Sequence, residues 1–221
     1  MTCAIYVAMS AAMKLNEELE RFAEDLPARL RADDSKMFPS LESKWDEENE
    51  VAADCFGGEW VQRGATLWVP SMVKGRGVKG KRRERLLSFR LDLHRDRSGD
   101  EDWAHASDAL LVVAFWGERD EYWCNDELVV SPQGRLANEE VWSKCGANRE
   151  FNGRLLLWLE PGEKPCSYSE GCWLFAIPLR TITDPDELDR RVVKPIVALL
   201  TESAAAAAAI EEAQAIKWAV T

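Results

Sequence analysis

The chain has 221 residues, of which 46% are hydrophobic and 30% are charged, and its formal net charge is −11. This length and apolar content are those of a globular protein with a sizeable core, which excludes global disorder. The excess of carboxylates disfavours general binding of the whole protein to nucleic acid or to an anionic membrane surface. No apolar run reaches the roughly 18 residues that a membrane span needs. We therefore expect a cytoplasmic protein that makes no membrane contact.

The numbers of cysteines and tryptophans further limit the kind of protein that this chain can be. The six cysteines are thinly spread, which is typical of a reduced cytosolic protein rather than of a disulfide scaffold. The chain also holds ten tryptophans. Each can remove a large apolar area from water while its indole N–H finds an acceptor. We therefore expect most of them in the core and a minority at a binding surface.

The first element that the sequence predicts is an amphipathic helix. We expect residues 1–12 to form an N-terminal extension without fixed structure, and residues 13–221 to form a single domain. Apolar residues then recur at spacings of three and four, with carboxylates between them. These apolar residues are Leu15, Leu19, Phe22, Leu26 and Leu30. Pro27 lies within the pattern and predicts a kink. The polar, acidic stretch 33–58 that follows predicts a long connection.

The middle of the chain changes to the period of β-strands. Strand-like stretches cover 59–69, 86–93, 109–116, 155–159 and 172–179, and a further one covers 121–130. The stretch 109–116 (ALLVVAFW) is almost entirely apolar, which is typical of a central strand buried on both faces. Short connections between consecutive strands leave no room for crossover helices, so the sequence predicts a largely antiparallel meander.

The end of the chain is predicted to be a long helix over 184–218. Asp184 is a good N-cap, Pro185 suits the first helical position, and Glu187 stands where a capping-box carboxylate belongs. An apolar stripe follows, formed by Leu188, Val192, Ile196, Leu199 and Leu200. Pro195 within this stripe predicts a kink. The expected fold class is therefore α+β: an N-terminal amphipathic helix, a five- to six-stranded meander, and a C-terminal helix packed on or beside the sheet.

A reversal of charge between residues 74 and 97 is the most unusual feature of the sequence. Ten lysines and arginines there stand against three carboxylates, so this segment carries about +7 and the rest of the chain about −18. Three glycines, Gly75, Gly77 and Gly80, would let its backbone approach an anion closely. The expected binding residues are cations of this segment, with two tryptophans of the preceding strand that could stack on bases. They are Lys74, Arg76, Lys79, Lys81, Arg82, Arg83, Arg85, Trp60 and Trp68. The competing interpretations are a solvated hairpin tip, or a tip that pairs with an acidic run such as 46–50 on a second subunit.

Other kinds of site are less well supported by the sequence. The cysteines at 124, 145, 166 and 172 contain no C-x-x-C pair, which disfavours a zinc site. Carboxylates and both histidines crowd into 92–108, a pattern that suits a metal-dependent hydrolase but also a solvated loop. A cysteine nucleophile would need one of these two histidines, and no G-x-S-x-G elbow is present. The G-x-G-x-x-G spacing at 75–80 lacks the helix that should follow it. We expect no metal, no cofactor and no catalytic residue.

These observations favour a non-enzymatic, acidic interaction protein that binds or inhibits a partner macromolecule, as small acidic inhibitors and immunity proteins do. Its acidic body would steer the encounter, and a buried aromatic anchor would follow. Two alternatives remain open. One is a nucleic-acid-associated protein that uses the basic segment 74–97, and the other is a metal-dependent, nuclease-like hydrolase that uses 92–108. The expected partner is a protein, with nucleic acid as the alternative and a homodimer as a further expectation.

Overall fold

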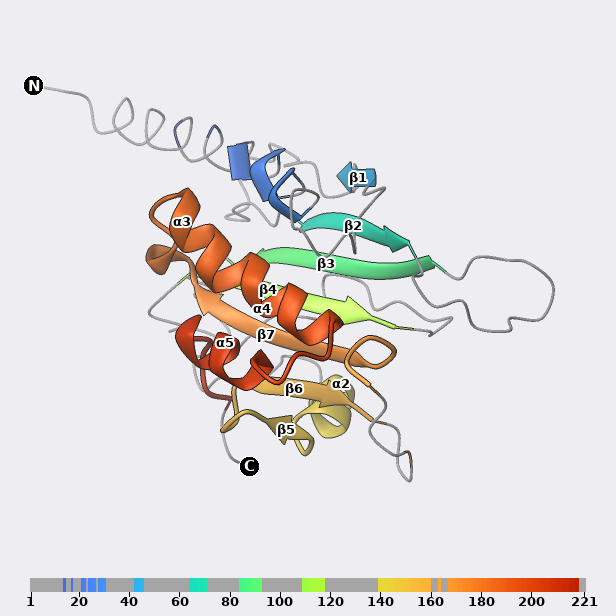
Figure 1. Ribbon diagram of the computed structural model, residues 1–221. Helices are drawn as coiled ribbons and strands as arrows, with labels where there is room; N and C mark the ends of the chain where they lie inside the picture. The colour runs from blue at the N-terminus through green and yellow to red at the C-terminus, as the bar shows by residue number, and fades with distance from the viewer. Residues whose placement is uncertain are drawn as a thin grey trace, which may run out of the picture.

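The computed structural model describes residues 42–45, 64–70, 84–92, 109–117, 139–159, 163 and 167–218, with helical positions 14, 17, 21–22, 24–26 and 28–30. For 42–45, 64–70, 84–86, 90–92 and 139–140 it describes the backbone alone. These residues form one antiparallel sheet with helices packed against it, so the predicted α+β class is confirmed (Figure 1). The expected extension 1–12 and the expected strand at 121–130 lie outside the described residues.

The described strands form a single sheet. They are β1 (Glu42–Trp45), β2 (Gly64–Pro70), β3 (Glu84–Asp92), β4 (Leu110–Trp116), β5 (Arg149–Glu150), β6 (Leu155–Trp158) and β7 (Cys172–Pro178). Their order is β1-β2-β3-β4-β7-β6-β5, and each neighbouring pair is antiparallel. The strands predicted at 109–116, 155–159 and 172–179 are confirmed to within one residue at each end. The connection predicted over 33–58 is wrong at β1, where pairing with β2 imposes an extended conformation on a polar sequence.

The strand order departs from the predicted single meander. β1 to β4 are consecutive neighbours, but β7 lies beside β4, with β6 and β5 outside it. Every residue of β4 is buried, and so is every residue of β7 except the last. Strands that are apolar on both faces are most stable inside a sheet, where both faces are covered and both edges are paired. This preference places β4 against β7 at the centre, although they are far apart in the sequence.

The helices that cover the sheet are shorter than the sequence predicts. They are α2 (Glu139–Cys145), the 3₁₀ turn η4 (Leu179–Thr181), α3 (Pro185–Leu188), the π-helical turn η5 (Asp189–Val193), α4 (Lys194–Leu200) and α5 (Ala206–Glu212). The predicted single helix over 184–218 is therefore interrupted between α4 and α5. In the predicted N-terminal helix, the described positions are helical, with Leu26 and Leu30 buried and Glu24 and Asp25 exposed.

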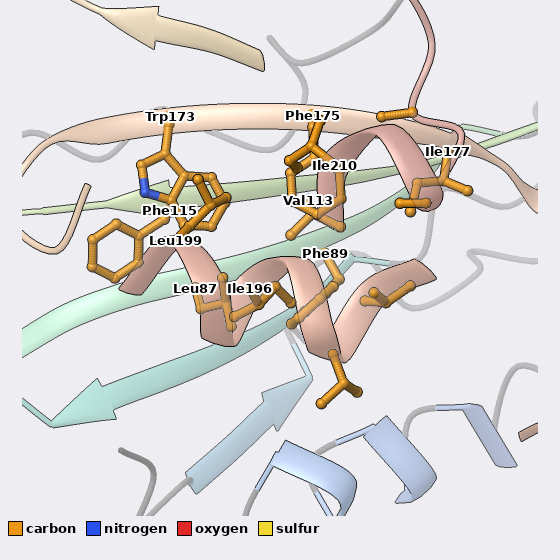
Figure 2. Packing of buried hydrophobic residues seen from close by; sticks show 14 of the residues in the cluster. Leu87, Phe89, Val113, Phe115, Trp173, Phe175, Ile177, Ile196, Leu199 and Ile210 are labelled. Atoms are coloured by element: carbon orange, nitrogen blue, oxygen red, sulfur yellow. The ribbon is translucent and has the colours of Figure 1, made fainter. Parts of the chain in front are cut away.

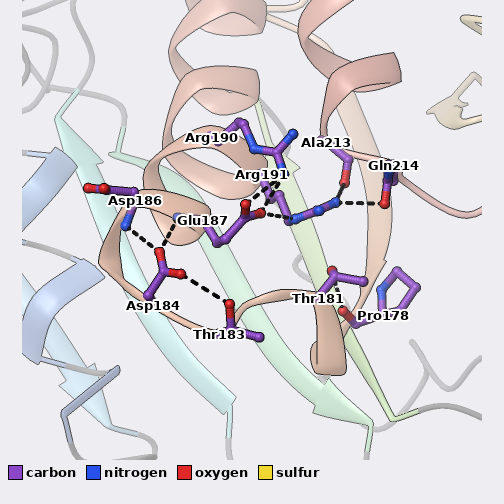
Figure 3. Close-up of polar contacts among 10 residues, drawn as sticks. All are labelled: Pro178, Thr181, Thr183, Asp184, Asp186, Glu187, Arg190, Arg191, Ala213 and Gln214. Atoms are coloured by element: carbon purple, nitrogen blue, oxygen red, sulfur yellow. Dashed lines mark hydrogen bonds and ion pairs between the residues drawn. The ribbon is translucent and has the colours of Figure 1, made fainter.

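The start of α3 follows the sequence signals closely. The Asp184 carboxylate accepts hydrogen bonds from the backbone N–H groups of Asp186 at 3.0 Å and Glu187 at 2.9 Å (Figure 3). The bond from Glu187 is the main cause of the lowered pKa of Asp184. Pro185 occupies the first turn, as predicted. The Glu187 side chain instead contacts Arg190 and Arg191, so the reciprocal half of the predicted capping box is replaced by ion pairs.

The kink predicted at Pro195 takes the form of the π-helical turn η5. Proline has no N–H to donate to the carbonyl four residues earlier, and its ring would clash with that carbonyl. The carbonyl belongs to Arg191, which lies within η5. The wider turn separates the two groups and lets the helical run continue from Pro185 to Leu200.

Helix α4 ends in a Schellman motif rather than continuing into the alanine run. The Ser203 N–H donates to the Ala198 carbonyl at 2.9 Å, and the Glu202 N–H donates to the Leu199 carbonyl at 3.0 Å. Glu202 has a φ of 53°, in the left-handed region that usually favours glycine. The motif turns the chain so that α5 packs beside α4 instead of extending it, which is why the predicted long helix is broken here.

The sheet separates two hydrophobic cores. On the face covered by α3, η5, α4 and α5, strand residues such as Val113, Phe115 and Phe175 pack against Ile196 and Leu199 (Figure 2). We call this the helical face. The Phe115 and Trp173 rings stack there with centroids 5.3 Å apart. The opposite face, which we call the tryptophan face, packs against α2 and carries Trp116, Trp142, Trp158 and Trp218.

The C-terminal strap, residues 213–218, joins the two cores. Ala213 and Ala215 are buried in the helical face, whereas Trp218 is buried in the tryptophan face and Ile216 packs against it. The Ile216 N–H donates to the Ala176 carbonyl of β7 at 2.8 Å. The Trp218 N–H donates to the Gly153 carbonyl at 2.9 Å. The strap thus continues the sheet beside β7 at the point where β6 begins.

Two arginines hold this strap. The buried Arg191 guanidinium donates to the Ala213 carbonyl and to the Gln214 side chain, both at 3.0 Å, and to Glu187 on its other side (Figure 3). Arg154 donates to the Ala215 carbonyl. These bonds satisfy backbone carbonyls of the strap itself, so the strap is fixed by charge-assisted hydrogen bonds as well as by burial.

Candidate functional site

One end of the sheet gathers the features that the sequence marks as candidates for binding. At this end β2, β4 and β6 finish and β3 and β7 begin, because alternate strands run in the same direction (Figure 1). The residues that define it are Pro70, Glu84, Trp116, Trp158 and Cys172. We call it the loop end of the sheet.

The basic segment is attached to the sheet at the loop end. Pro70 of β2 is paired with Glu84 of β3, so the two strand ends that 71–83 connects lie side by side. Of the predicted binding residues, Arg85 lies in β3 opposite Val69, and Trp68 lies in β2 opposite Leu86. The others are outside the described residues: Lys74, Arg76, Lys79, Lys81, Arg82, Arg83 and Trp60. The structure thus fixes the two anchor points of the predicted site.

Cross-strand pairing places several tryptophans in one row near the loop end. Trp68 is paired with Leu86, Leu86 with Trp116, and Trp158 with Cys172. The Trp116 ring is buried, and its Nε1–H donates to the buried Ser88 hydroxyl at 3.1 Å. Trp158 is also buried, with the Lys144 ammonium 4.8 Å from its ring centroid. Trp116 and Trp158 are therefore core residues, as the sequence predicts for most of the ten.

The second connection at the loop end joins β6 to β7, and its described part is Ser167–Gly171. Gly117, at the end of β4, packs directly against this loop. A Cβ at Gly117 would overlap the Glu170 carbonyl oxygen and would lie 2.8 Å from the Gly171 carbonyl oxygen. Only glycine allows so close a backbone approach, so this contact holds the loop on the end of the sheet.

Hydroxyl groups of this loop are bound to carboxylates of other elements. The Ser169 hydroxyl donates to Glu202 at 2.6 Å, and the Tyr168 hydroxyl donates to Glu150. The hydrogen bond from Ser169, followed by one from Ser167, lowers the pKa of Glu202. Burial, followed by the bond to Glu150, raises the pKa of Tyr168. The loop is therefore held by hydrogen bonds to a carboxylate of β5 and to one in the turn after α4.

A shallow hollow lies beside this loop. Its walls are mainly apolar and come from Leu157, Trp158, Leu159, Cys172 and Trp173. The loop residues Ser167, Tyr168 and Gly171 complete it. Its enclosed space amounts to about one water molecule, which is too small for a cofactor or for a side chain of a partner.

The other predicted chemistries are only partly covered by the structure. Cys145 and Cys172 are buried in the tryptophan face, where they pack as small hydrophobes. Among the residues that the structure describes, no group of three or more histidine, cysteine, aspartate or glutamate side chains is arranged to hold a metal ion. Of the 92–108 cluster, Asp92 ends β3 and the other carboxylates and both histidines lie outside the described residues. No helix of the described part is long and apolar enough to cross a membrane.

Sequence reasoning missed the loop 167–171 and the hollow beside it. The signal that could have found them is the run Ser167–Gly171 itself, three hydroxyl residues followed by a glutamate and a glycine between two apolar strands. The partners Glu150 and Glu202 are 18 and 33 residues away from the side chains they bind, so no local pattern could indicate them.

Comparison with known proteins gives no relative: no family model matches the chain, and neither does a curated protein or a solved structure.

Proposed function

We propose that this protein is a non-enzymatic interaction protein that binds a partner protein through the loop end of its sheet. The observation that carries the proposal is that two connections of opposite charge are attached to one end of a rigid sheet. The connection 71–83 contains six lysines and arginines and no carboxylate, whereas 159–171 contains three glutamates and one lysine. The first connection joins β2 to β3 and the second joins β6 to β7, and β3 and β7 lie on either side of the central strand β4. Loops on a rigid scaffold are the usual location of binding residues.

Opposite charges at one end of the molecule favour a protein partner. A surface that presents a basic and an acidic region side by side is complementary to a partner with the reverse arrangement. Such complementarity sets the orientation of a complex and raises its association rate. Nucleic acid presents phosphates alone, so it would match only the basic connection.

Quantitative affinity capture with the full chain as bait tests the proposal. The test variant is Lys81→Ala/Arg82→Ala/Arg83→Ala, and the matched control is Lys14→Ala/Lys194→Ala/Lys217→Ala, which removes the same charge from exposed positions elsewhere. We expect a partner that is captured by the native chain and by the control and is lost with the test variant. Equal recovery with all three proteins would contradict a role for the loop end.

Nucleic-acid binding is the second candidate, and the pairing of Pro70 with Glu84 supports it because it brings the two anchor points of the basic connection together. Fluorescence anisotropy of labelled single- and double-stranded DNA and RNA, from about 50 to 200 mM salt, separates the two candidates. Steep salt dependence that disappears in the 81–83 variant but not in the control would favour nucleic acid. The absence of binding at low salt would remove this candidate.

A further inference from the structure

We infer that Asn152 is a site of spontaneous backbone modification, and that its conversion to isoaspartate releases the end of the C-terminal strap. The sequence contains a single Asn-Gly pair, Asn152-Gly153, which lies in the turn between β5 and β6. The reacting groups are the Asn152 amide, the Gly153 N–H and water. The inference goes beyond the proposed function, because this turn belongs to neither connection at the loop end.

The turn has an unusual backbone conformation. Phe151, Asn152 and Gly153 have φ values of 52°, 59° and 81°, so three consecutive residues lie in the left-handed region. Glycine and asparagine tolerate this region, whereas it is strained for phenylalanine. Phe151 is kept there because its ring packs against the core of the helical face and lies 5.7 Å from the Tyr168 ring. Packing of Phe151 thus fixes the turn and leaves Asn152 exposed on it.

The reacting groups of Asn152 and Gly153 are accessible to each other and to water. Among the described residues, no hydrogen bond engages the Asn152 amide group or the Gly153 N–H. Gly153 has no side chain to crowd its nitrogen. A Cβ placed there would meet only the Trp218 carbonyl oxygen, 4.0 Å away, so the surroundings of this residue are open. The Gly153 nitrogen can therefore approach Cγ of Asn152.

The modification is a ring closure followed by hydrolysis. The Gly153 nitrogen gives its proton to a base in the solvent and attacks Cγ of Asn152, and the amide nitrogen takes up a proton and leaves as ammonia. The resulting succinimide ring includes the Cα–C bond of Asn152 but not its N–Cα bond, so the left-handed φ needs no change. Water then opens the ring, and its attack on the backbone carbonyl gives isoaspartate, whereas attack on Cγ gives aspartate. Ammonia diffuses away, so the change runs in one direction.

The two residues that follow Asn152 hold the end of the strap. The Gly153 carbonyl accepts from the Trp218 N–H at 2.9 Å, and the Arg154 carbonyl accepts from the Trp218 indole at 3.2 Å. The Arg154 guanidinium donates to the Ala215 carbonyl. Isoaspartate inserts one more carbon atom into the backbone directly before these groups and moves them away from their partners. Release of the buried Trp218 ring then uncovers part of the tryptophan face.

Asn148 provides a control within the same chain. Its side-chain amide donates to the Lys144 carbonyl at 2.5 Å, which holds it away from the next backbone nitrogen. The residue that follows it is Arg149, whose side chain crowds that nitrogen. Asn148 should therefore persist under conditions that convert Asn152. Cleavage after lysine and arginine places the two asparagines in separate peptides, 145–149 and 150–154.

Ageing of the full chain in mildly alkaline buffer, made with water labelled with heavy oxygen, tests the modification. After tryptic digestion, chromatography and mass spectrometry should resolve the peptide 150–154 into the unchanged form and two products of equal mass. Each product should have an NH₂ group replaced by a hydroxyl and carry one heavy oxygen atom, while the peptide 145–149 stays unchanged. An unchanged peptide 150–154, or equal conversion of both peptides, would overturn the site.

Hydrogen exchange of the purified isoaspartate form tests release of the strap. We expect the Trp218 amide to exchange about tenfold faster than in the fresh chain, because its hydrogen bond to Gly153 is lost. Asn152→Asp carries the charge of the product without the longer backbone and should keep slow exchange. Asn152→Gly lacks the reactive amide, adopts the left-handed conformation readily and should keep slow exchange after ageing. Unchanged exchange in the isoaspartate form, or equally fast exchange in Asn152→Asp, would overturn release by backbone insertion.

Discussion

On the helical face of the sheet, aliphatic and aromatic side chains of the strands pack against α3, η5, α4 and α5 and against Leu26 and Leu30 of the N-terminal helix. On the tryptophan face, the described residues that give cover belong to the seven-residue helix α2 and the C-terminal strap, and indole rings fill the space above small residues such as Ala114 and Ala176. The first face relies on the amount of apolar area that its helices bury. The second relies on a few large rings in fixed positions.

Hydrogen bonds of indole groups are more numerous on the tryptophan face, although on the helical face the Trp173 N–H also donates to the Tyr168 carbonyl at 2.8 Å. The four tryptophan-face rings include two whose N–H groups bind specific acceptors: Trp116 donates to Ser88, and Trp218 donates to the Arg154 carbonyl at 3.2 Å. Trp142 lies 6.4 Å from Trp218 and 5.8 Å from the Arg149 guanidinium. A ring with a required acceptor fits in only one orientation. The comparison teaches that one sheet can be stabilised by area on one side and by specific contacts on the other.

The largest expected change in stability comes from removing buried apolar area on the helical face. Phe115→Ala should lower the free energy of unfolding by about 3–5 kcal/mol, because it deletes a fully buried ring that stacks on Trp173. Urea denaturation followed by circular dichroism measures the change. The conservative Phe115→Leu is the control and should cost much less. A loss below about 1 kcal/mol for the alanine variant would show that the helices do not pack on β4 as described.

The hydrogen bonds of Arg191 to the C-terminal strap should have the next largest effect on the free energy of unfolding. Arg191→Met should cost about 2–3 kcal/mol, because it leaves the Ala213 carbonyl without this donor and frees the strap from η5. Arg190→Met is the matched control, since Arg190 shares the Glu187 partner but is bonded only within the helical run. Hydrogen exchange of residues 213–218 should accelerate in the first variant alone. Equal exchange in both variants would argue against a strap held by Arg191.

The smallest expected change in stability concerns the hydrogen bond between Trp116 and Ser88 on the tryptophan face. A double-mutant cycle of Trp116→Phe and Ser88→Ala should give a coupling of about 1 kcal/mol, because each single change leaves a buried polar group without its partner. Thermal unfolding of the four proteins measures this coupling. Additive effects would mean that the indole N–H does not matter for stability, and that this face too is stabilised by area alone.

The binding site divides into a predictable and an unpredictable part. The run of cations from Lys74 to Arg83 is conspicuous in the sequence because it reverses the charge of its surroundings. The placement of the loop Ser167–Gly171 at the same end of the sheet is not conspicuous, since the carboxylates that bind it come from distant elements. A binding segment made of consecutive residues can be predicted from the sequence. A surface assembled from residues that are distant in the sequence becomes visible only in the folded structure.

The amino-acid sequence by itself determined the elements whose signals are local: the apolar strands β4, β6 and β7, the N-cap at Asp184, and the distortion before Pro195. The tertiary structure alone decided the pairing of β4 with β7, the strand conformation of 42–45, the left-handed turn at Glu202 and the path of the C-terminal strap. The physical reason is the range of the forces involved. Hydrophobic period, capping and proline sterics act within a few residues, whereas sheet order and the strap depend on hydrogen bonds and burial between groups that only folding brings together.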